Sequence, residues 1–400
     1  MKFYIRTLGC KMNWLDSARL AAALQAAGHQ QVAEEGEADH VFVNTCTVTA
    51  EAERKSRQTV KQIQQGPGTV AVMGCSPRVA DNGWQEEGSR KVFHSTNELF
   101  AHFGIEMDEE RLPLQSRTRL PVAIQTGCDN ICTFCITRVA RGAHRNLPAE
   151  AIIRQIQQAH EHGIQEVILT GINLAAWGCE NSRRPEQARL HQLLEQILEQ
   201  TSIPRIRISS LGPQFIQPGF WDVYAEPRIC DHLHISLQSG SDSVLSRMIR
   251  EHGTDEVAEL AVQARRRRAN TALFADIIAG FPGESDTQHQ QGLDFLQASG
   301  FSRLHVFPFS PRQGTPAASM VEQLDGSRKK ARAAELRQLS RQLWQSFIGT
   351  QMGKTAQVLL ESSGTSGLSS NHIRVLVNHG EMGEIRPVLL SPENTAQNPS

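Results

Sequence analysis

A run of three closely spaced cysteines is the part of the sequence whose chemistry follows most directly from residue type and spacing. The segment Cys128-Asp129-Asn130-Ile131-Cys132-Thr133-Phe134-Cys135 has the pattern CxxxCxxC. Three thiolates on one loop can bind three irons of a 4Fe–4S cluster. The fourth iron then has no ligand from the protein and stays open to a chelating small molecule. The spacing therefore predicts a cluster with an open coordination site on Cys128, Cys132 and Cys135.

An open iron of this kind suits S-adenosylmethionine (SAM), whose amino and carboxylate groups can chelate it. An electron from the cluster can cleave the sulfonium and release a 5′-deoxyadenosyl radical, while the protein supplies position and exclusion of water. The alternative is zinc, which normally takes four ligands, as paired CxxC or with added His. No second pair lies nearby, and His144 stands alone in a polar loop. We therefore predict a radical-SAM enzyme in which these cysteines have the catalytic role.

Three further cysteines, Cys10, Cys46 and Cys75, each come a few residues after a short apolar segment that is typical of a buried strand. Ligands of an open parallel sheet bind at the carboxyl ends of its strands. We therefore expect these thiols to converge on one metal centre. The alternative is three unrelated buried thiols, because free cysteines are often buried.

The elements around these three cysteines alternate between strand and helix. Strands are expected at residues 3–5, 41–43 and 70–73. Asp16 or Ser17 is expected to cap a helix that runs to Gly28, and residues 51–65 form a second helical segment. This alternation predicts a small α/β domain with a parallel sheet in residues 1–110.

A second series of strands and helices is expected in residues 118–350, after a polar linker at 104–119. The strand segments are 122–125, 167–169, 206–208, 233–237, 275–279 and 304–307. The helical segments are 149–162, 191–199, 254–268 and 285–299. Six strands alternating with helices predict an incomplete (β/α)6 barrel, open on one side for a large substrate.

The C-terminal part differs in pattern from the rest of the chain. A long basic helix is expected from Asp325 to about Gln351. Residues 356–361, 373–377 and 385–390, separated by Gly- and Ser-rich turns, predict a small β-barrel in residues 351–392. The tail 394–400 is expected to be disordered.

Composition limits the class of protein and its compartment. The chain of 400 residues has a net charge of −1, so a global basic signature of nucleic-acid binding is absent. No apolar run approaches the roughly 18 residues of a membrane span, and the first residues lack a signal-peptide core. We expect a cytoplasmic protein with no membrane partner. In that reducing compartment, the eight cysteines indicate metal or redox chemistry in preference to disulfides.

Several longer motifs occur in a fixed order along nearly the whole chain. They are residues 7–13, 44–49, 74–75, 128–135, 140–142, 169–174, 237–242, 276–284 and 309–317. With these motifs the sequence resembles the radical-SAM methylthiotransferases, most of all the branch acting on N6-threonylcarbamoyladenosine in tRNA. The C-terminal segment resembles a TRAM domain, an RNA-binding module, although it is short and slightly acidic here.

The resemblance implies two 4Fe–4S clusters, the second an auxiliary cluster on Cys10, Cys46 and Cys75 whose open iron carries the sulfur to be donated. One SAM molecule would methylate that sulfur. A second would yield the radical that removes hydrogen from C2 of the target adenine, and the carbon radical would capture the methylthio group. The implied partners are the anticodon stem–loop of a tRNA and a reductase or flavodoxin-type electron donor.

Residues at barrel strand ends are candidates for the SAM pocket, because such positions carry function in barrels. They are Gly171, Asn173, Ser209, Gln238 and Asp276. We also expect SAM contacts in the stretches 238–241 and 280–283, where the alternative is tight turns without a ligand.

Arginines supply the candidates for contact with RNA phosphates. Arg141, Arg145 and Arg312 lie on loops at strand ends and are the candidates we favour. The run 265–268 is interpreted as the solvated end of a helix, since cations suit helix C-termini. Cys179 and Cys230 match no motif and are expected to be ordinary thiols.

Three hypotheses about the function remain open. The first is methylthiolation of tRNA. Within it, residues 44–49 and 141–145 favour threonylcarbamoyladenosine, and Lys11-Met12-Asn13 with Asp16-Ser17 favours isopentenyladenosine. The second is methylthiolation of a residue in a ribosomal protein. The third, from another class of function, is a non-catalytic iron–sulfur or zinc module that binds RNA.

Overall fold

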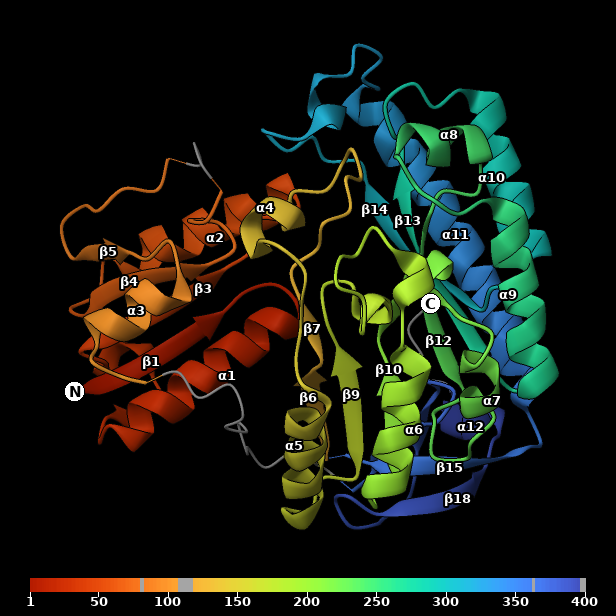
Figure 1. Ribbon diagram of the computed structural model, residues 1–400, viewed down its shortest axis with the longest axis horizontal. Coiled ribbons are helices and arrows are strands. Elements are labelled where there is room, and N and C mark those ends of the chain that lie inside the picture. Colours follow the sequence, from red (N-terminus) through yellow and green to blue (C-terminus); the bar gives the residue numbers. More distant parts are fainter. Residues whose placement is uncertain (80–82, 107–117, 362–363, 396–400) are drawn as a thin grey trace.

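The computed structural model describes residues 1–79, 83–106, 118–361 and 364–395. An N-terminal α/β unit lies beside a larger α/β core, and a small antiparallel sheet lies at one end of that core (Figure 1). No helix in these ranges combines the length and the apolar character needed to cross a bilayer.

The N-terminal unit is built on a parallel sheet in the order β2-β1-β3-β4-β5. Its strands are β1 (Lys2–Thr7), β2 (Gln30–Gln31), β3 (His40–Thr45), β4 (Thr69–Gly74) and β5 (Arg90–Val92). Its helices are α1 (Lys11–Ala26), α2 (Ala50–Ile63) and α3 (Thr96–His102), with a 3-10 turn at Glu35–Glu37. Apolar clusters cover both faces of the sheet, which explains why its strands are continuous apolar runs. The expected small parallel α/β unit is confirmed.

Helix α1 begins earlier than the sequence predicted, so the expected cap at Asp16 or Ser17 is wrong. The extended backbone of Cys10 precedes the first helical residue, Lys11. The first turns bury Met12 and Leu15 against the core of the larger unit, and this packing stabilises residues that have no strong helix signal of their own. The Ser17 hydroxyl instead accepts hydrogen bonds from Thr7 and Asn44.

The larger unit contains parallel strands that follow one another across two adjoining sheets, in the orders β10-β9-β6 and β11-β12-β13-β14. The strands are β6 (Arg119–Ala123), β9 (Glu166–Thr170), β10 (Arg205–Ile208), β11 (Ser210–Leu211), β12 (His232–Gln238), β13 (Ala272–Ala279) and β14 (Arg303–Pro308). Strands β10 and β11 are one run interrupted at Ser209, so six strand positions are present, as predicted.

Helices of this unit pack around the strands and bury an extended apolar core. They are α4 (Thr137–Arg141), α5 (Ala149–Glu161), α6 (Leu190–Gln200), α7 (Phe220–Tyr224), α8 (Asp242–Arg247), α9 (Thr254–Arg267), α10 (Asp286–Ala298) and α11 (Gly326–Gln351). A short antiparallel pair, β7 (Gln125–Thr126) and β8 (Arg145–Asn146), flanks the cysteine loop. Short 3-10 turns lie at Leu174–Ala176, Pro185–Gln187, Pro213–Phe215 and Pro316–Ser319. The long helix predicted from Asp325 to about Gln351 is confirmed as α11, and the Asp325 side chain caps it. Of the linker predicted at 104–119, residues 107–117 lie outside the described part of the chain.

The C-terminal segment is an antiparallel sheet in the order β17-β16-β15-β18. Its strands are β15 (Thr355–Leu360), β16 (Ser366–Ser369), β17 (Arg374–Leu376) and β18 (Ile385–Leu389). Strand β16 was not predicted, because its sequence Ser-Gly-Leu-Ser has low strand propensity and is held by its two neighbours. The expectation of a disordered tail at 394–400 is wrong for Asn394 and Thr395, which belong to the short helix α12 (Pro392–Thr395), and residues 396–400 are not described.

This sheet packs against the amino ends of the core strands. Glu166 is fully buried there and pairs with Arg205 and Arg207 at 2.8 and 2.7 Å. The same arginines donate to the backbone carbonyls of Leu368 and Ser370. Functional groups of parallel α/β folds lie at the opposite, carboxyl ends of the strands. The C-terminal sheet therefore closes the end of the core that is remote from the cysteine loop.

Candidate active site

The loop with the CxxxCxxC pattern lies between β7 and α4, at the carboxyl end of the first core strand. Two tethers fix its backbone. Asp129 accepts from the backbone of His144 and donates its own N–H to the Ser182 hydroxyl at 2.7 Å. Farther along the loop, the N–H of Thr133 donates to the carbonyl of Met248 and the carbonyl of Thr133 accepts from Ala317. These bonds join distant segments, so the three thiols are held on a preformed loop.

Polar groups also surround the thiols of this loop. Arg250 Nη1 lies 3.3 Å from Cys132 Sγ. Ser182 Oγ and Asn173 Nδ2 lie 3.8 and 4.0 Å from Cys128 Sγ. Such donors stabilise sulfur in its anionic form, which is the form that binds metal.

The other three cysteines lie at the ends of adjacent parallel strands, as the sequence predicted. Cys10 follows β1, Cys46 follows β3 and Cys75 follows β4 directly. The register pairs Thr7 with Asn44 and Thr45 with Gly74, so the three strands end at the same edge. Each of the three thiols therefore reaches the same space above the sheet.

Asn13 of α1 connects these thiols, a role that no feature of the sequence indicated. Its side chain is fully buried, and its amide donates to the carbonyls of Leu8 and Thr45, both at 2.8 Å. Its oxygen lies 3.7 Å from Cys10 Sγ and 3.6 Å from Cys75 Sγ and accepts from Arg141. Asn13 thus fixes the spacing of two thiols and links them to a cation.

Glycines at two strand ends make this close approach possible. Gly9 and Gly74 directly precede Cys10 and Cys75 and have φ angles of +105° and +99°. A Cβ on Gly74 would lie 2.3 Å from Asn44 Oδ1, and one on Gly9 would lie 2.9 Å from Cys46 Cβ. Both positions therefore need glycine, for the left-handed backbone and for space.

The local environment favours the protonated form of two thiols in each set. Burial raises the pKa of Cys46 and Cys75 in the first set and of Cys128 and Cys135 in the second, and neighbouring thiols of the same set add to this effect. Arg141 acts in the opposite direction on Cys46 and Cys75. Metal binding at either set would therefore release protons.

The spacing of the thiols bears on which metal centre they fit. Ligand atoms of a tetrahedral zinc with Zn–S bonds of about 2.3 Å lie about 3.8 Å apart. Among the residues that the structure describes, neither cysteine set brings three ligand atoms within 4.8 Å of one another. This argues against a zinc ion held by three thiolates of either set in this arrangement. A 4Fe–4S cluster, whose irons each take one thiolate, does not need so close an approach, so both sets are compatible with it.

One cavity of about 520 Å³ joins these features. All three cysteines of the loop and Cys10 of the other set line it. The five residues predicted for the SAM pocket also line it: Gly171, Asn173, Ser209, Gln238 and Asp276. Of the two glycine-containing stretches, only 238–241 contributes to the lining. Gly280 and Gly283 pack against Lys329 and Glu322, so the tight-turn alternative describes that stretch.

Asp276 has histidine partners that the sequence did not reveal. His234 Nε2 lies 2.9 Å and His305 Nδ1 3.8 Å from Asp276 Oδ1, and Ser210 donates to the other carboxylate oxygen. Burial would raise the pKa of Asp276, but His234 and His305 lower it overall, so the group is ionised at neutral pH. These two histidines and the carboxylate form a compact polar group that could bind a cation.

Two of the arginines predicted to contact phosphate have other partners. The Arg141 side chain is 5% exposed and pairs with Asp16 at 2.6 Å. Arg312 is buried and donates to the Thr47 hydroxyl at 2.6 Å. Both guanidinium groups are used by acceptors inside the protein, so for these two the prediction is wrong, whereas Arg145 is exposed.

Four other sequence interpretations can be compared with the structure. Arg265 and Arg268 donate to the carbonyls of Gly300 and Ile229 at the end of α9, which agrees with the helix-end interpretation. Cys179 and Cys230 are buried, and their thiols contact the carbonyl of Arg184 and the carboxylate of Glu166. His144 contacts Gln125 and Asn146.

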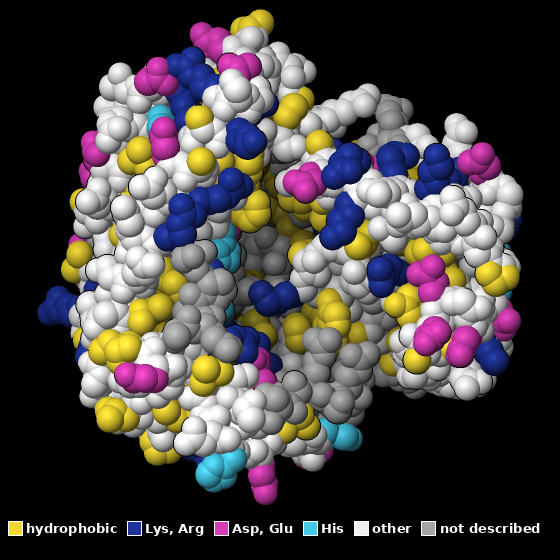
Figure 2. All heavy atoms as spheres, turned by 180° about the vertical axis from the view of Figure 1, so that it is seen from behind, with side chains coloured by type: hydrophobic (Ala, Val, Ile, Leu, Met, Phe, Trp, Pro, Cys, Tyr) yellow, Lys and Arg dark blue, Asp and Glu magenta, His cyan; other side chains and the backbone are white. Residues whose placement is uncertain are grey.

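Figure 2 shows a deep hollow between the two α/β units, with Lys and Arg side chains on both of its rims. The overall charge of −1 thus conceals a local positive surface. Such a surface favours an anionic partner.

Comparison with known proteins gives matches along most of the chain. Residues 2–93 match the uncharacterized protein family UPF0004, and residues 122–296 match the radical SAM superfamily. The chain is 32% identical to a threonylcarbamoyladenosine tRNA methylthiotransferase of Thermotoga maritima, over 97% of this chain and 95% of the relative. A protein of the same name from Bacillus subtilis is 33% identical, over 89% of this chain and 84% of the relative. A tRNA-2-methylthio-N(6)-dimethylallyladenosine synthase of Sphingopyxis alaskensis is 30% identical, over 90% and 87%.

Solved structures share the fold at much lower identity. The radical S-adenosylmethionine methyltransferase TsrM of Kitasatospora setae, with cobalamin and a [4Fe-4S] cluster bound, matches with a TM-score of 0.53 and 13% identity. The match covers 79% of this chain and 77% of that one.

Proposed function

We propose that this chain, which belongs to the radical-SAM methylthiotransferases, adds a 2-methylthio group to N6-threonylcarbamoyladenosine next to the anticodon of tRNA. It is a tRNA methylthiotransferase, and the nucleoside is the one named for its relatives in Thermotoga maritima and Bacillus subtilis.

The observation that carries this proposal is the shared cavity. Cys10 of the strand-end set and the three cysteines of the loop line the same space. Methylthiolation needs a radical source and a sulfur source that both reach one carbon of the substrate. A chamber bordered by both sets of thiols provides that proximity, which is worth several kcal/mol of the barrier for a well-oriented reaction.

We assign one 4Fe–4S cluster to Cys128, Cys132 and Cys135 and a second to Cys10, Cys46 and Cys75. When bound, a cluster with an open iron supplies the electron that cleaves SAM. Arg250 and Ser182 position and polarise the loop thiols. Asn13 and Arg141 do the same for the strand-end thiols. Asp276, held by His234, supplies a fixed negative charge in the cavity, where the sulfonium of SAM carries a positive one.

The organisation of the chain supports this assignment. We propose the domains 1–110, 118–350 and 351–392, since the family matches fall within the first two. We propose that the core is an incomplete (β/α)6 barrel, and the succession of parallel strands across its two sheets supports this. The C-terminal strands would be a reduced TRAM-like module that closes the barrel floor. A reductase or flavodoxin-type protein would supply the electron, and the site of action would be the cytoplasm.

The test is mass spectrometry of nucleosides in tRNA from a strain that lacks the gene. We expect the 2-methylthio group of threonylcarbamoyladenosine to disappear while the isopentenyl form stays intact, and the wild-type gene to restore it. Loss from the isopentenyl nucleoside would assign the chain to the activity named for the Sphingopyxis relative. Unchanged methylthio-nucleosides would contradict a tRNA substrate and direct the search to ribosomal protein.

A further inference from the structure

The cysteine chamber, which is the cavity of about 520 Å³ that both sets of thiols line, is rich in positive charge. Among the described residues of its lining, the only carboxylate is Asp276. The lysine and arginine side chains of the same lining are Lys11, Arg119, Arg138, Arg207 and Arg250. Which of these cations already have partners decides what further ligand the chamber can bind.

Three of the arginines and the carboxylate are used inside the protein. Arg119 and Arg207 each pair with a glutamate at 2.7 Å. Arg250 contacts Cys132 Sγ and donates to a backbone carbonyl. Asp276 pairs with a histidine at 2.9 Å and accepts from a serine hydroxyl. None of these four groups is therefore free to bind a charged part of the substrate.

Lys11 and Arg138 are the two cations that remain. Both side chains are exposed to solvent although they line the chamber. Within the part of the chain that the structure describes, neither side chain makes a hydrogen bond or an ion pair. Asp276 attracts the Lys11 ammonium from beyond ion-pair distance, whereas Arg119 and Arg207 repel it. An anion that enters the chamber would therefore meet two cations that have no partner in this part of the chain.

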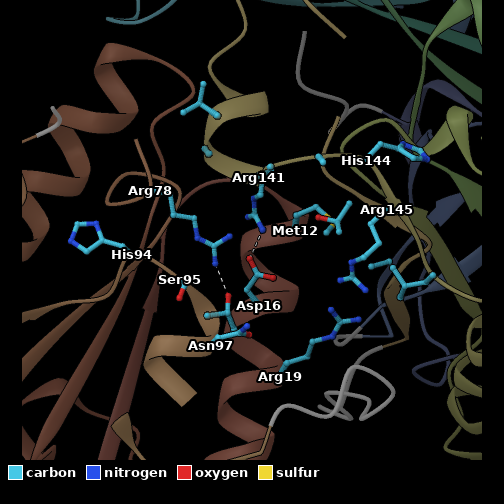
Figure 3. Close-up of a pocket in the computed structure, with 18 of the residues that line it drawn as sticks. Met12, Asp16, Arg19, Arg78, His94, Ser95, Asn97, Arg141, His144 and Arg145 are labelled. Atoms are coloured by element: carbon cyan, nitrogen blue, oxygen red, sulfur yellow. Dashed lines mark hydrogen bonds and ion pairs between the residues drawn. The ribbon is translucent and has the colours of Figure 1, made fainter. Parts of the chain in front are cut away.

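The fold holds these two cations where the N-terminal unit meets the core. Lys11 is the first residue of α1 and directly follows the first strand-end cysteine, whereas Arg138 lies on α4, just after the last cysteine of the loop. Figure 3 shows the Arg141 side chain pointing from α4 toward Asp16 on α1, where the two groups form an ion pair of 2.6 Å. This pair joins the two helices, so the positions of Lys11 and Arg138 relative to each other are restrained.

The proposed nucleoside supplies a suitable anion. Its threonylcarbamoyl group carries a carboxylate, whereas an isopentenyl group is a hydrocarbon that gives a cation no partner. C2, which receives the methylthio group, and C6, which carries N6, are both bonded to N1 of the purine ring. A substrate whose C2 lies between the two sets of thiols therefore brings the start of its N6 substituent into the same chamber. A guanidinium can bind a carboxylate through two parallel hydrogen bonds, and an ammonium binds it as a point charge.

We propose that Lys11 and Arg138 bind the carboxylate of the threonylcarbamoyl group and so make the enzyme select this nucleoside over isopentenyladenosine. The inference rests on the proposed function, because it takes the modified nucleoside of tRNA to be the substrate. SAM also has a carboxylate, but the open iron of the loop cluster would bind that one. A site built to bind a polar group of its substrate discriminates against an analogue that lacks the group. The charge of Lys11 thus argues against the isopentenyl nucleoside, which the motif around Lys11 favoured in the sequence.

The experiment compares two synthetic anticodon stem–loop RNAs on the anaerobic holoenzyme. One carries threonylcarbamoyladenosine with its free carboxylate, and the other carries the neutral methyl ester of the same nucleoside. The KM of methylthiolation and the Kd from fluorescence anisotropy are measured for both RNAs. A defect in folding or in binding of the RNA backbone affects both RNAs alike, so the ratio of acid to ester isolates the contact with the carboxylate.

The wild type should prefer the acid. We expect Lys11→Met and Arg138→Gln each to raise the KM and the Kd for the acid roughly fivefold and to leave the values for the ester unchanged. The double variant should treat the two RNAs alike. Lys11→Arg keeps the charge and should keep the preference. Lys55→Met, at an exposed lysine of α2, is the matched control and should also keep the wild-type preference.

Three outcomes would overturn the proposal. The first is equal KM and Kd values for acid and ester in the wild type. The second is an equal rise for both RNAs in the variants, which would make the two cations contacts for RNA phosphates. The third is an unchanged preference together with weaker SAM binding or an altered electron paramagnetic resonance (EPR) spectrum of the auxiliary cluster. That result would assign the cations to SAM or to the cluster.

Transfer of the methylthio group in the same preparations tests the proposed function separately. If the wild type binds the acid more tightly than the ester, and the variants lose this preference, the carboxylate site stands even where no methylthio group is transferred. In that case the assigned reaction fails. If the wild type modifies acid and ester equally well, the reaction stands and the carboxylate site fails.

Discussion

The guanidinium of Arg250 lies 3.3 Å from the sulfur of Cys132, and its other terminal nitrogen donates to the carbonyl of Ser236 at 2.9 Å. This second bond fixes the arginine, so a positive charge is held beside one thiol of the loop. Because Arg250 follows α8 and Cys132 precedes α4, only the folded chain brings them together.

Replacement of Arg250 should make the loop cluster harder to reduce, because reduction adds negative charge beside the lost cation. For Arg250→Gln we expect the midpoint potential to fall by roughly 60 mV, a tenfold change in a one-electron equilibrium. Potentiometry followed by EPR spectroscopy would measure it. Arg250→Lys keeps the charge and should stay near the wild type. An unchanged midpoint potential in Arg250→Gln would show that Arg250 does not tune the reduction of the loop cluster.

Single cysteine substitutions should separate the two proposed clusters. The wild type is expected to hold about eight irons, and Cys46→Ala and Cys132→Ala about four each, because each variant loses one cluster. Cys46→Ala should still cleave SAM to 5′-deoxyadenosine without transferring a methylthio group, whereas Cys132→Ala should do neither. Iron analysis would measure the cluster content of each variant, and chromatography of the products would measure SAM cleavage and methylthio transfer. Cys179→Ala, at a buried thiol that belongs to neither set, is the control. Full iron content in Cys46→Ala would argue against the auxiliary cluster.

Asp276→Asn should weaken SAM binding, because it removes the negative charge that we propose attracts the sulfonium of SAM in the cavity. We expect the Kd to rise about tenfold, equal to about 1.4 kcal/mol, with the cluster retained. Anaerobic titration calorimetry would measure the Kd. Asp286→Asn, at an exposed carboxylate of α10, is the matched control and should bind normally. Equal affinities in the two variants would exclude Asp276 from the pocket.

Titration of the Asp276 carboxylate should not change the affinity for SAM between pH 6 and 8. His234 and His305 hold the pKa of Asp276 below its ordinary value, and burial lowers the pKa of His305 to about 4. The carboxylate is therefore charged, and His305 neutral, across that range. A titration of Kd with a midpoint near pH 7 in the wild type that disappears in Asp276→Asn would show that this assignment of charge is wrong.

Glu166→Gln should destabilise the end of the core against which the C-terminal sheet packs. The wild-type carboxylate balances Arg205 and Arg207 in a fully buried network, and removing one partner of such a network costs about 3–5 kcal/mol. Thermal unfolding followed by circular dichroism would show the loss. Glu361→Gln, which removes a partly exposed partner of Arg119, should cost much less.

The Glu166 carboxylate also makes the stability of the protein depend on pH in the acid range. Burial alone would raise the pKa of Glu166, but Arg207 and Arg205 outweigh it and lower the pKa from 4.5 to about 2. A depressed pKa gives stability that is present above pH 4.5 and is lost as the pH falls toward 2. Glu166→Gln should lack this part of the acid sensitivity. Parallel acid unfolding curves for both proteins would show that the carboxylate is not its source.

The sequence by itself determined the features that depend on local spacing. The three cysteines within residues 128–135 lie on one loop because too few residues separate them to do otherwise. Apolar runs defined the parallel strands, and the rule that ligands bind at strand ends placed Cys10, Cys46 and Cys75 at one edge before their contacts were known. Asp325 marked the start of α11 in the same local way.

Only the tertiary structure decided which distant residues share a space. Arg141 and Arg312 lie at strand ends and have the right residue type for phosphate, but Asp16 and Thr47 from the other unit take up their donors. The shared cavity, the histidines beside Asp276 and the bond from Arg250 to Cys132 depend on how separate elements pack. The physical reason is that secondary-structure propensity and hydrophobic periodicity depend on residues that are close together along the chain. These contacts instead come from side-chain packing between elements that are far apart in sequence.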